Sequence, residues 1–134
     1  MNEIQRLNIR TDKRTQLIDI TEKVRAVVKG SGVSDGEVEI FVPHTTAAVT
    51  INENYDPTVQ ADILGFLANL VPPNAGYQHT EGNSDAHIKS SLVGTSATVF
   101  IADGDLVFGT WQGIYFCEFD GPRNRQALVK IIPD

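Results

Sequence analysis

The chain of 134 residues has little sulfur and no long hydrophobic run. Its single cysteine, Cys117, has no partner for an intramolecular disulfide, which is typical of proteins in a reducing cytoplasm. No apolar run approaches the roughly 18 residues that a membrane-spanning helix needs, and the first segment, MNEIQRLNIR, lacks the apolar core of a signal peptide. These absences predict a cytoplasmic protein that does not interact with membranes.

Basic residues are outnumbered, with 11 Lys and Arg against 17 Asp and Glu, so the formal net charge is −6. A general nucleic-acid binder needs a net basic face, and we therefore expect no nucleic-acid partner. A local basic site for a small anionic molecule is compatible with this balance. The length and the 41% hydrophobic content predict a single domain over residues 1–134.

Hydrophobic periodicity predicts an α+β fold: a mostly antiparallel β-sheet or sandwich with two or three helices in a single compact domain. Alternating or β-branched segments predict strands at four places, which are residues 4–20 as a hairpin, 36–54 with a break at Pro43, 96–121 as a hairpin around Asp103-Gly104, and 125–132.

Helix boundaries are indicated by capping residues. Thr21 is typical of an N-cap for a helix that ends at Gly30, and Asp56 with Pro57 is typical of the start of a second helix. That second helix has an apolar stripe and is ended by two prolines. A third, short helix is predicted from residue 85 to about 93, after Asn83 or Ser84 and before Gly94.

The segment QHTEGNSDAHIKSSLVG, residues 78–94, contains two of the three histidines, His79 and His87. On one continuous helix, residues eight apart would lie about 12 Å from each other, too far to share a metal ion. Gly82 and Asn83 interrupt such a helix, and a bend there would bring the two rings together. His87 would then lie in a first helical turn, where the helix dipole favours the neutral imidazole that binds metals or accepts protons.

The third histidine, His44, lies where the strand-like segment VPHTTAAVTINEN turns polar. Three histidines from separate segments can hold a catalytic zinc ion with one position open, and Glu53, Glu81 and Asp85 could support such a site or act as a base. Three unrelated histidines are the alternative, because there is no HExxH motif and no CxxC pair.

Phosphate ligands are suggested by Arg123 and Arg125, which share one strand face after the turn FDGP and could bind an anion bidentately. The alternative is a solvated turn with ordinary surface charges. The helix start at Asn83 also offers free backbone N–H groups to an anion, with Lys89 offsetting the charge of Asp85.

Hydroxyls and buried polar groups complete the candidate set. Thr45 and Thr46 either orient substrate or are ordinary strand residues. In GTWQGIYFCEFDG, alternation places Cys117 with the aromatic face, as a small buried hydrophobe, and places Gln112 and Glu118 on the other face. Gln112 and Glu118 are the better site candidates, because buried polar groups require partners.

Three blocks, PHTTAAVTINEN, HTEGNSDAHIKSSLVG and GTWQGIYFCEFDGPRNR, together resemble the YjbQ family, also called the secondary thiamine-phosphate synthase family. The resemblance spans nearly the whole chain and implies a compact α+β fold that assembles as a homotrimer. It also implies a polar site at His44, His79 and His87, often with a bound metal. The implied activity joins a pyrimidine diphosphate to a thiazole phosphate and releases pyrophosphate.

Three functions follow as hypotheses. The first is the synthase-like enzyme, which binds phosphorylated small molecules and neutralises the leaving pyrophosphate with Arg, Lys or a divalent ion, either zinc or magnesium. The second is a zinc-dependent hydrolase with Glu53 or Glu81 as general base. The third is a non-enzymatic trimeric module that binds a metal or ligand. A site with an open fourth metal position would favour the two enzymes over the third hypothesis.

Overall fold

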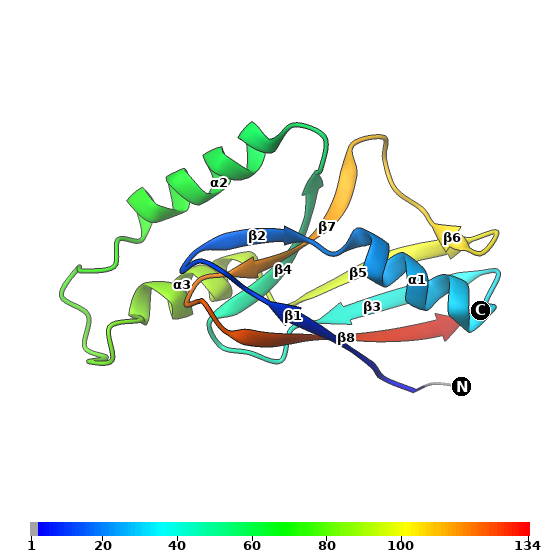
Figure 1. Cartoon of the computed structure of the whole chain (residues 1–134), viewed down its shortest axis with the longest axis horizontal. Helices are drawn as coiled ribbons and strands as arrows, with labels where there is room; N and C mark the ends of the chain where they lie inside the picture. The colour runs from blue at the N-terminus through cyan, green and yellow to red at the C-terminus, as the bar shows by residue number, and fades with distance from the viewer. Residues whose placement is uncertain (1–2) are drawn as a thin grey trace.

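The computed structural model describes residues 3–134 (Figure 1). Its elements are, in chain order, β1 (Gln5–Arg10), β2 (Gln16–Asp19), α1 (Thr21–Ser31), β3 (Gly36–Phe41), β4 (Ala47–Glu53), α2 (Pro57–Leu70), α3 (Ser84–Val93), β5 (Ser96–Ala102), β6 (Asp105–Leu106), β7 (Gln112–Glu118) and β8 (Asn124–Pro133).

The strands form two sheets in which every neighbouring pair is antiparallel. The five-stranded sheet has the order β1-β8-β3-β5-β6, and the three-stranded sheet has the order β2-β7-β4. Figure 1 shows β8 beside β1, and α2 standing apart from the five-stranded sheet. The predicted α+β fold, with mostly antiparallel sheets and three helices in a single compact domain, is confirmed.

The predicted hairpin over residues 4–20 is wrong, because its two strands belong to different sheets. β1 pairs with β8, with Ile9 opposite Arg125, whereas β2 pairs with β7, with Leu17 opposite Cys117. Alternation identifies a half-buried strand but does not say which strand lies beside it. The loop between β1 and β2 therefore crosses from one sheet to the other.

The turn at Asp103-Gly104 is confirmed, with φ values of 52° and 76°. These positive angles suit the tight hairpin turn that joins β5 to β6. The hairpin ends there, because β6 is only two residues long and the long strand that follows, β7, joins the other sheet. The predicted hairpin over residues 96–121 is thus wrong beyond Leu106.

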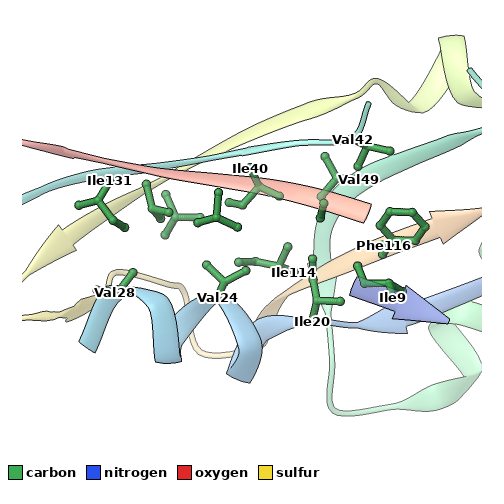
Figure 2. Packing of buried hydrophobic residues seen from close by; sticks show 14 of the residues in the cluster. Ile9, Ile20, Val24, Val28, Ile40, Val42, Val49, Ile114, Phe116 and Ile131 are labelled. Carbon is green, nitrogen blue, oxygen red and sulfur yellow. The ribbon is translucent and has the colours of Figure 1, made fainter. Parts of the chain in front are cut away.

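The main core lies between the five-stranded sheet, α1 and one face of the three-stranded sheet. Figure 2 shows Val24 and Val28 of α1 facing this cluster, with Ile40 of β3 and Ile114 of β7 in it. These side chains are completely buried, and each one contributes roughly 1.5–3 kcal/mol through removal of apolar surface from water.

A second, smaller core lies on the other face of the three-stranded sheet. It consists of Ala48, Ala86, Cys117 and Phe119, with partly buried residues of α2 and α3 packed against them. β7 is therefore buried on both faces, as its alternation predicts. Cys117 is buried, as predicted for a small hydrophobe, and this burial raises the pKa of its thiol to about 12, which disfavours the reactive thiolate.

The start and end of α1 differ from the prediction by one or two residues. Thr21 is the first helical residue, and the Asp19 carboxylate accepts its backbone N–H at 2.9 Å. The Thr21 hydroxyl instead accepts the Ile114 N–H of β7 at 2.9 Å, which ties the helix start to the three-stranded sheet. The helix continues through Gly30 and ends before Gly32, whose φ of 71° is left-handed.

The other two helices agree with the prediction to within one or two residues, although the Asn83 side chain makes no capping hydrogen bond. The Asp56 carboxylate accepts the Thr58 N–H at 2.9 Å and Pro57 is the first residue of α2. α3 runs between Asn83 and Gly94, which has a φ of 101°. In residues 3–134, no helix combines the length and the hydrophobicity that crossing a membrane requires.

Candidate functional site

A polar depression of about 430 Å³ lies where three loops meet: the one between β3 and β4, the start of α3, and the turn between β7 and β8. All three loops come from the blocks that the sequence marks as candidates. The lining residues are Pro43, His44, Thr45 and Thr46 from the first segment, Glu81, Asn83 and His87 from the segment that includes the first turn of α3, and Asp120, Arg123 and Arg125 from the β7–β8 turn and the start of β8.

His44 is held by a hydrogen bond from a part of β8 that extends beyond the end of its partner strand β3. β3 ends at Phe41, opposite Leu128, while β8 extends further, back to Asn124. The Gln126 N–H thus lies beyond the β3 ladder, and it donates to His44 Nε2 at 3.0 Å instead. A neutral imidazole has one acceptor nitrogen and one N–H, so Nε2 is the acceptor and Nδ1 carries the proton.

The surroundings of His44 also disfavour the charged form of the ring. Burial and the positive charge of Arg125 lower its pKa from the ordinary histidine value. Nδ1 makes no hydrogen bond within residues 3–134, and no side-chain nitrogen or oxygen there is both buried and unpartnered. Solvent therefore reaches Nδ1, and His44 offers an N–H donor to a ligand.

His79 and His87 are brought together, as the bend at Gly82 predicts. Their ring centroids are 5.4 Å apart and the rings meet edge to face, at 88°. His79 Nε2 lies 3.0 Å from Asn83 Oδ1 and 3.0 Å from Glu81 Oε2. Because both neighbours are acceptors, this nitrogen carries a proton. The His87 ring makes no hydrogen bond in the described residues and lines the depression.

The three histidines do not fit a shared metal site in this arrangement. Within residues 3–134, no three His, Cys, Asp or Glu side chains are placed to hold one ion. The lone pair of His44 is taken by the Gln126 N–H, and His79 presents a protonated nitrogen to its carboxylate and amide neighbours. A metal ligand must offer an unprotonated nitrogen. His44 offers none in this tautomer, His79 would have to use Nδ1, and the ring nitrogens of His87 make no hydrogen bond within residues 3–134.

Arg125 is buried and its hydrogen bonds are mostly internal. Its Nε donates to Glu118 Oε1 at 2.8 Å, and its Nη2 donates to Glu118 Oε2 at 2.5 Å and to Thr46 Oγ1 at 2.8 Å. Glu118, completely buried, also accepts the Thr11 hydroxyl at 2.8 Å and the Asp120 N–H at 3.0 Å. Burial alone would raise the pKa of Glu118, but these donors lower it below its usual range.

Arg123 is different from Arg125, although the sequence places both on one strand face. It precedes β8, is half exposed, and binds Asp120 through Nε to the backbone oxygen at 2.7 Å and through Nη2 to Oδ2 at 3.0 Å. A guanidinium has five N–H donors, so most of them stay available to a ligand. The two arginines predicted as phosphate ligands therefore differ: Arg125 is buried and bonded to Glu118 and Thr46, whereas Arg123 is half exposed.

Asp120 connects the loops of the depression and is absent from the predicted site residues. It accepts the Asn83 amide at 2.9 Å in addition to Arg123. Burial alone would raise its pKa, but these two hydrogen bonds hold the pKa of Asp120 below its ordinary value. The sequence signal for it was the DGPR turn, which places a carboxylate three residues before an arginine.

The turn that carries Asp120 and Arg123 is fixed by Gly121. A Cβ atom at this position would lie 2.3 Å from the Lys13 carbonyl oxygen, so only glycine allows the two loops to approach. The Gly121 N–H donates to the Arg14 oxygen at 3.0 Å. The loop between β1 and β2 thereby supports the turn that carries Asp120 and Arg123.

Asp85 and Lys89 lie beneath the site instead of lining it. Both are buried on α3, where Lys89 Nζ is 3.4 Å from Asp85 Oδ2. Arg14, half exposed, closes the group with a 2.9 Å contact to Asp85 Oδ1. The predicted roles of Asp85 in catalysis and of Lys89 in phosphate binding do not fit this geometry, because each charge is buried with its partner.

Glu53 and Gln112 lie at the far end of the three-stranded sheet, opposite each other in the β4–β7 register. Glu53 accepts the Asp56 N–H at 3.2 Å, and Gln112 accepts the Gly109 N–H at 2.8 Å. Neither lines the depression, so their predicted roles as base and as phosphate ligand do not fit. Gln112 is exposed, although its place in the alternating segment made it a candidate for a buried polar residue.

Thr45 and Thr46 line the depression, as predicted. The Thr46 hydroxyl accepts a hydrogen bond from Arg125 at 2.8 Å, so its own proton is free to be donated elsewhere. The Thr45 backbone oxygen accepts the Ser90 hydroxyl at 2.6 Å, which anchors this loop to α3. Chemically, the N–H and O–H donors of the depression suit a polar, anionic group, and the His87 ring lies beside them.

Comparison with known proteins gives one consistent result. The model of a family described as "UPF0047 protein YjbQ-like" matches residues 5–134. Among curated relatives, a UPF0047 protein of Methanocaldococcus jannaschii is 58% identical over 94% of this chain and 91% of its own length. The UPF0047 protein YugU of Bacillus subtilis is 48% identical over 96% of this chain and 98% of its own length.

Solved structures of similar proteins share the fold of this chain. A crystal structure of a YjbQ/UPF0047 family protein from Clostridium acetobutylicum has a TM-score of 0.94 and 54% identity, covering 96% of this chain and 99% of that chain. A YbjQ-like protein from Sulfolobus solfataricus has a TM-score of 0.95 and 32% identity, covering 100% of this chain and 99% of that chain. The same fold is therefore retained at much lower identity.

Proposed function

The chain belongs to the YjbQ-like UPF0047 family, and on that premise we propose that it is an enzyme with thiamine-phosphate synthase activity. It joins a pyrimidine diphosphate to a thiazole phosphate and releases pyrophosphate. The observation that carries the proposal is the depression itself, where hydrogen-bond donors from three loops face one polar space.

The reaction breaks a carbon–oxygen bond to a diphosphate, so negative charge develops on the leaving group. Donors fixed in advance around that charge stabilise the transition state more than the ground state. Arg123 supplies the exposed positive charge, His44 Nδ1 supplies a neutral N–H, and Thr46 supplies a hydroxyl. The buried pair of Arg125 and Glu118 holds Thr46 in place.

His87 is the proposed proton donor or acceptor. Its ring lines the depression without a hydrogen bond to any other side chain in residues 3–134, unlike His44 and His79. A ring in this position can exchange a proton with a molecule bound in the depression. For the alternative, a zinc-dependent hydrolase, Glu53 lies outside the depression, which leaves Glu81 as the one of its two predicted bases that lines it.

The test is to incubate the purified protein with both phosphorylated substrates and to measure pyrophosphate and thiamine phosphate. Arg123→Ala should weaken inorganic phosphate binding by about ten- to a hundred-fold, since a charge-assisted hydrogen bond contributes roughly 1.5–3 kcal/mol. Arg25→Ala is the matched control, because Arg25 is also a partly exposed, ion-paired arginine but lies in α1, away from the depression. Absence of turnover together with equal phosphate affinities in the three proteins would refute the proposal.

Binding of a divalent metal, zinc or magnesium, stays a prediction, and no step of the proposed reaction depends on it. Zinc bound by all three histidines would require His44 to lose the hydrogen bond from Gln126. Metal analysis of the wild type and of His44→Ala would test this. Equal metal content in both would exclude His44 as a ligand.

We also propose a homotrimer and a cytoplasmic location. In the single chain no residue of α2 is buried, and Phe66 and Leu70 are 67% and 57% exposed. An apolar groove lined by Ile63, Phe66 and Leu67 of α2 continues onto Leu17 and Phe119. Exposed apolar surface of this kind is typical of subunit interfaces. Light scattering that returns the mass of a monomer would refute the trimer.

A further inference from the structure

A second depression, of about 460 Å³, adjoins the first on the edge of the five-stranded sheet. The walls that distinguish it are cross-strand neighbours of β1 and β8: Asn8 lies opposite Gln126, and Arg10 lies opposite Asn124. Side chains at alternate strand positions share a face, so these four polar groups stand side by side on one surface.

The charged side chains that line this second depression, Arg10 and Arg125, are both positive. No aspartate or glutamate lines it, whereas the first depression contains Glu81 and Asp120. Arg10 is exposed and takes part in none of the ion pairs formed within residues 3–134. The amides of Asn8 and Asn124 can donate hydrogen bonds, and Gln126 Nε2, which donates to Asn8 Oδ1 at 3.4 Å, has a second N–H. A cation without a counter-ion, flanked by donors, is the arrangement that an oxyanion needs.

The two depressions share His44 and Arg125 as a common wall. His44 Nδ1 carries a proton and is reached by solvent, as described above. Arg125 uses Nε and Nη2 for Glu118 and Thr46, while Nη1 makes no hydrogen bond within residues 3–134. Because no buried side-chain nitrogen there lacks a partner, Nη1 also reaches solvent. The common wall therefore presents N–H donors.

We propose that the second depression is an anion subsite that binds a phosphoryl group through Arg10, beside the first site and separated from it by His44. The subsite deepens the proposed function and rests on it for its role, since a reaction between two phosphorylated molecules needs a place for each phosphoryl group. The first depression, around Arg123, receives the leaving diphosphate, and the Arg10 depression receives the phosphate of the other reactant.

The experiment is a titration of the isotope-labelled protein with inorganic phosphate at constant ionic strength, followed through backbone amide signals. Asn8 and Asn124 report on the Arg10 depression, and Gly82 and Asp120 report on the first one. We expect saturable shifts at both. Arg10→Gln should weaken the response at Asn8 and Asn124 about ten-fold and leave that at Gly82 and Asp120 unchanged.

Lys130→Gln is the matched control, because it removes the same charge from an exposed position of β8 outside the depression. If Arg10→Gln and Lys130→Gln give the same change, the effect is general charge screening and the subsite is refuted. A response only at Gly82 and Asp120 also refutes the subsite but leaves the proposed function standing. A response only at Asn8 and Asn124 supports the subsite and contradicts the diphosphate site at Arg123. No saturable response at any of them refutes both.

Discussion

Replacing Glu118 by glutamine removes a negative charge from the buried support of the candidate site. In the native protein both carboxylate oxygens accept two hydrogen bonds each. Oε1 accepts Thr11 Oγ1 and Arg125 Nε, and Oε2 accepts Arg125 Nη2 and the Asp120 N–H. In Glu118→Gln one oxygen becomes an NH₂ group that faces donors, so at least two hydrogen bonds are lost whichever way the amide is turned.

The expected loss in the free energy of unfolding is about 3–5 kcal/mol. Arg125 is 6% exposed and Glu118 is fully buried, so removing one charge leaves the other without compensation in a poorly solvated place. A surface pair gives less than about 1 kcal/mol. The double replacement Glu118→Leu with Arg125→Met should be less destabilising than Glu118→Gln, since it buries no unpaired charge.

The assay is urea unfolding at one protein concentration, repeated at several pH values. The pKa of Glu118 is lower in the folded protein than its ordinary value, although burial opposes this. Its contribution is therefore fully present above about pH 4.3, the usual glutamate pKa, and is lost as the pH falls through the lower folded value. The difference between wild type and Glu118→Gln should shrink on acidification.

Glu22→Gln is the control, because Glu22 is ion-paired to Arg25 but its side chain is 80% exposed. It should change the free energy of unfolding by no more than about 0.5 kcal/mol. A Glu118→Gln variant that is destabilised as little as this control would refute the reasoning. So would a double replacement that is more destabilising than the single one.

Three further results are expected. His87→Ala should abolish pyrophosphate release with little change in melting temperature, because its ring makes no hydrogen bond within residues 3–134; a lower melting temperature with normal turnover per folded molecule would contradict this. Cys117 should not react with thiol reagents at pH 8 until urea is added, because its pKa is about 12; fast reaction of the native protein would show that it is accessible. Asp56→Ala should destabilise the start of α2 by about 1 kcal/mol, measured by amide exchange, with Asp62→Ala as an exposed control outside the cap.

Local chemistry in the sequence determined where most elements begin and end. Asp56 caps α2 and Gly94 ends α3, because a side-chain acceptor and a residue tolerant of positive φ act on their immediate neighbours. The turn at Asp103-Gly104 is equally local. The alternation of β7 predicted burial on both faces, since side chains point to opposite faces in any strand.

Strand partners, in contrast, were decided only by the tertiary structure. β1 and β2 adjoin in the chain but pair with β8 and β7 in separate sheets. An alternating strand buries one face equally well in either sheet, so its pattern carries no information about its neighbour. The two hairpins predicted from chain proximity were wrong, wholly or in part, for this reason.

For the candidate site as well, some features were predictable from the sequence and others depended on the tertiary structure. The sequence identified the segments that form it and predicted that His79 and His87 come together, because Gly82 and Asn83 interrupt the chain between them. It gave no sign that His44 would accept the Gln126 N–H, since that depends on β8 extending past the end of β3. Nor did it separate Arg123 from Arg125. Which arginine is buried depends on Glu118, seven residues away along the chain, and a buried charge is stabilised only by the groups that folding places beside it.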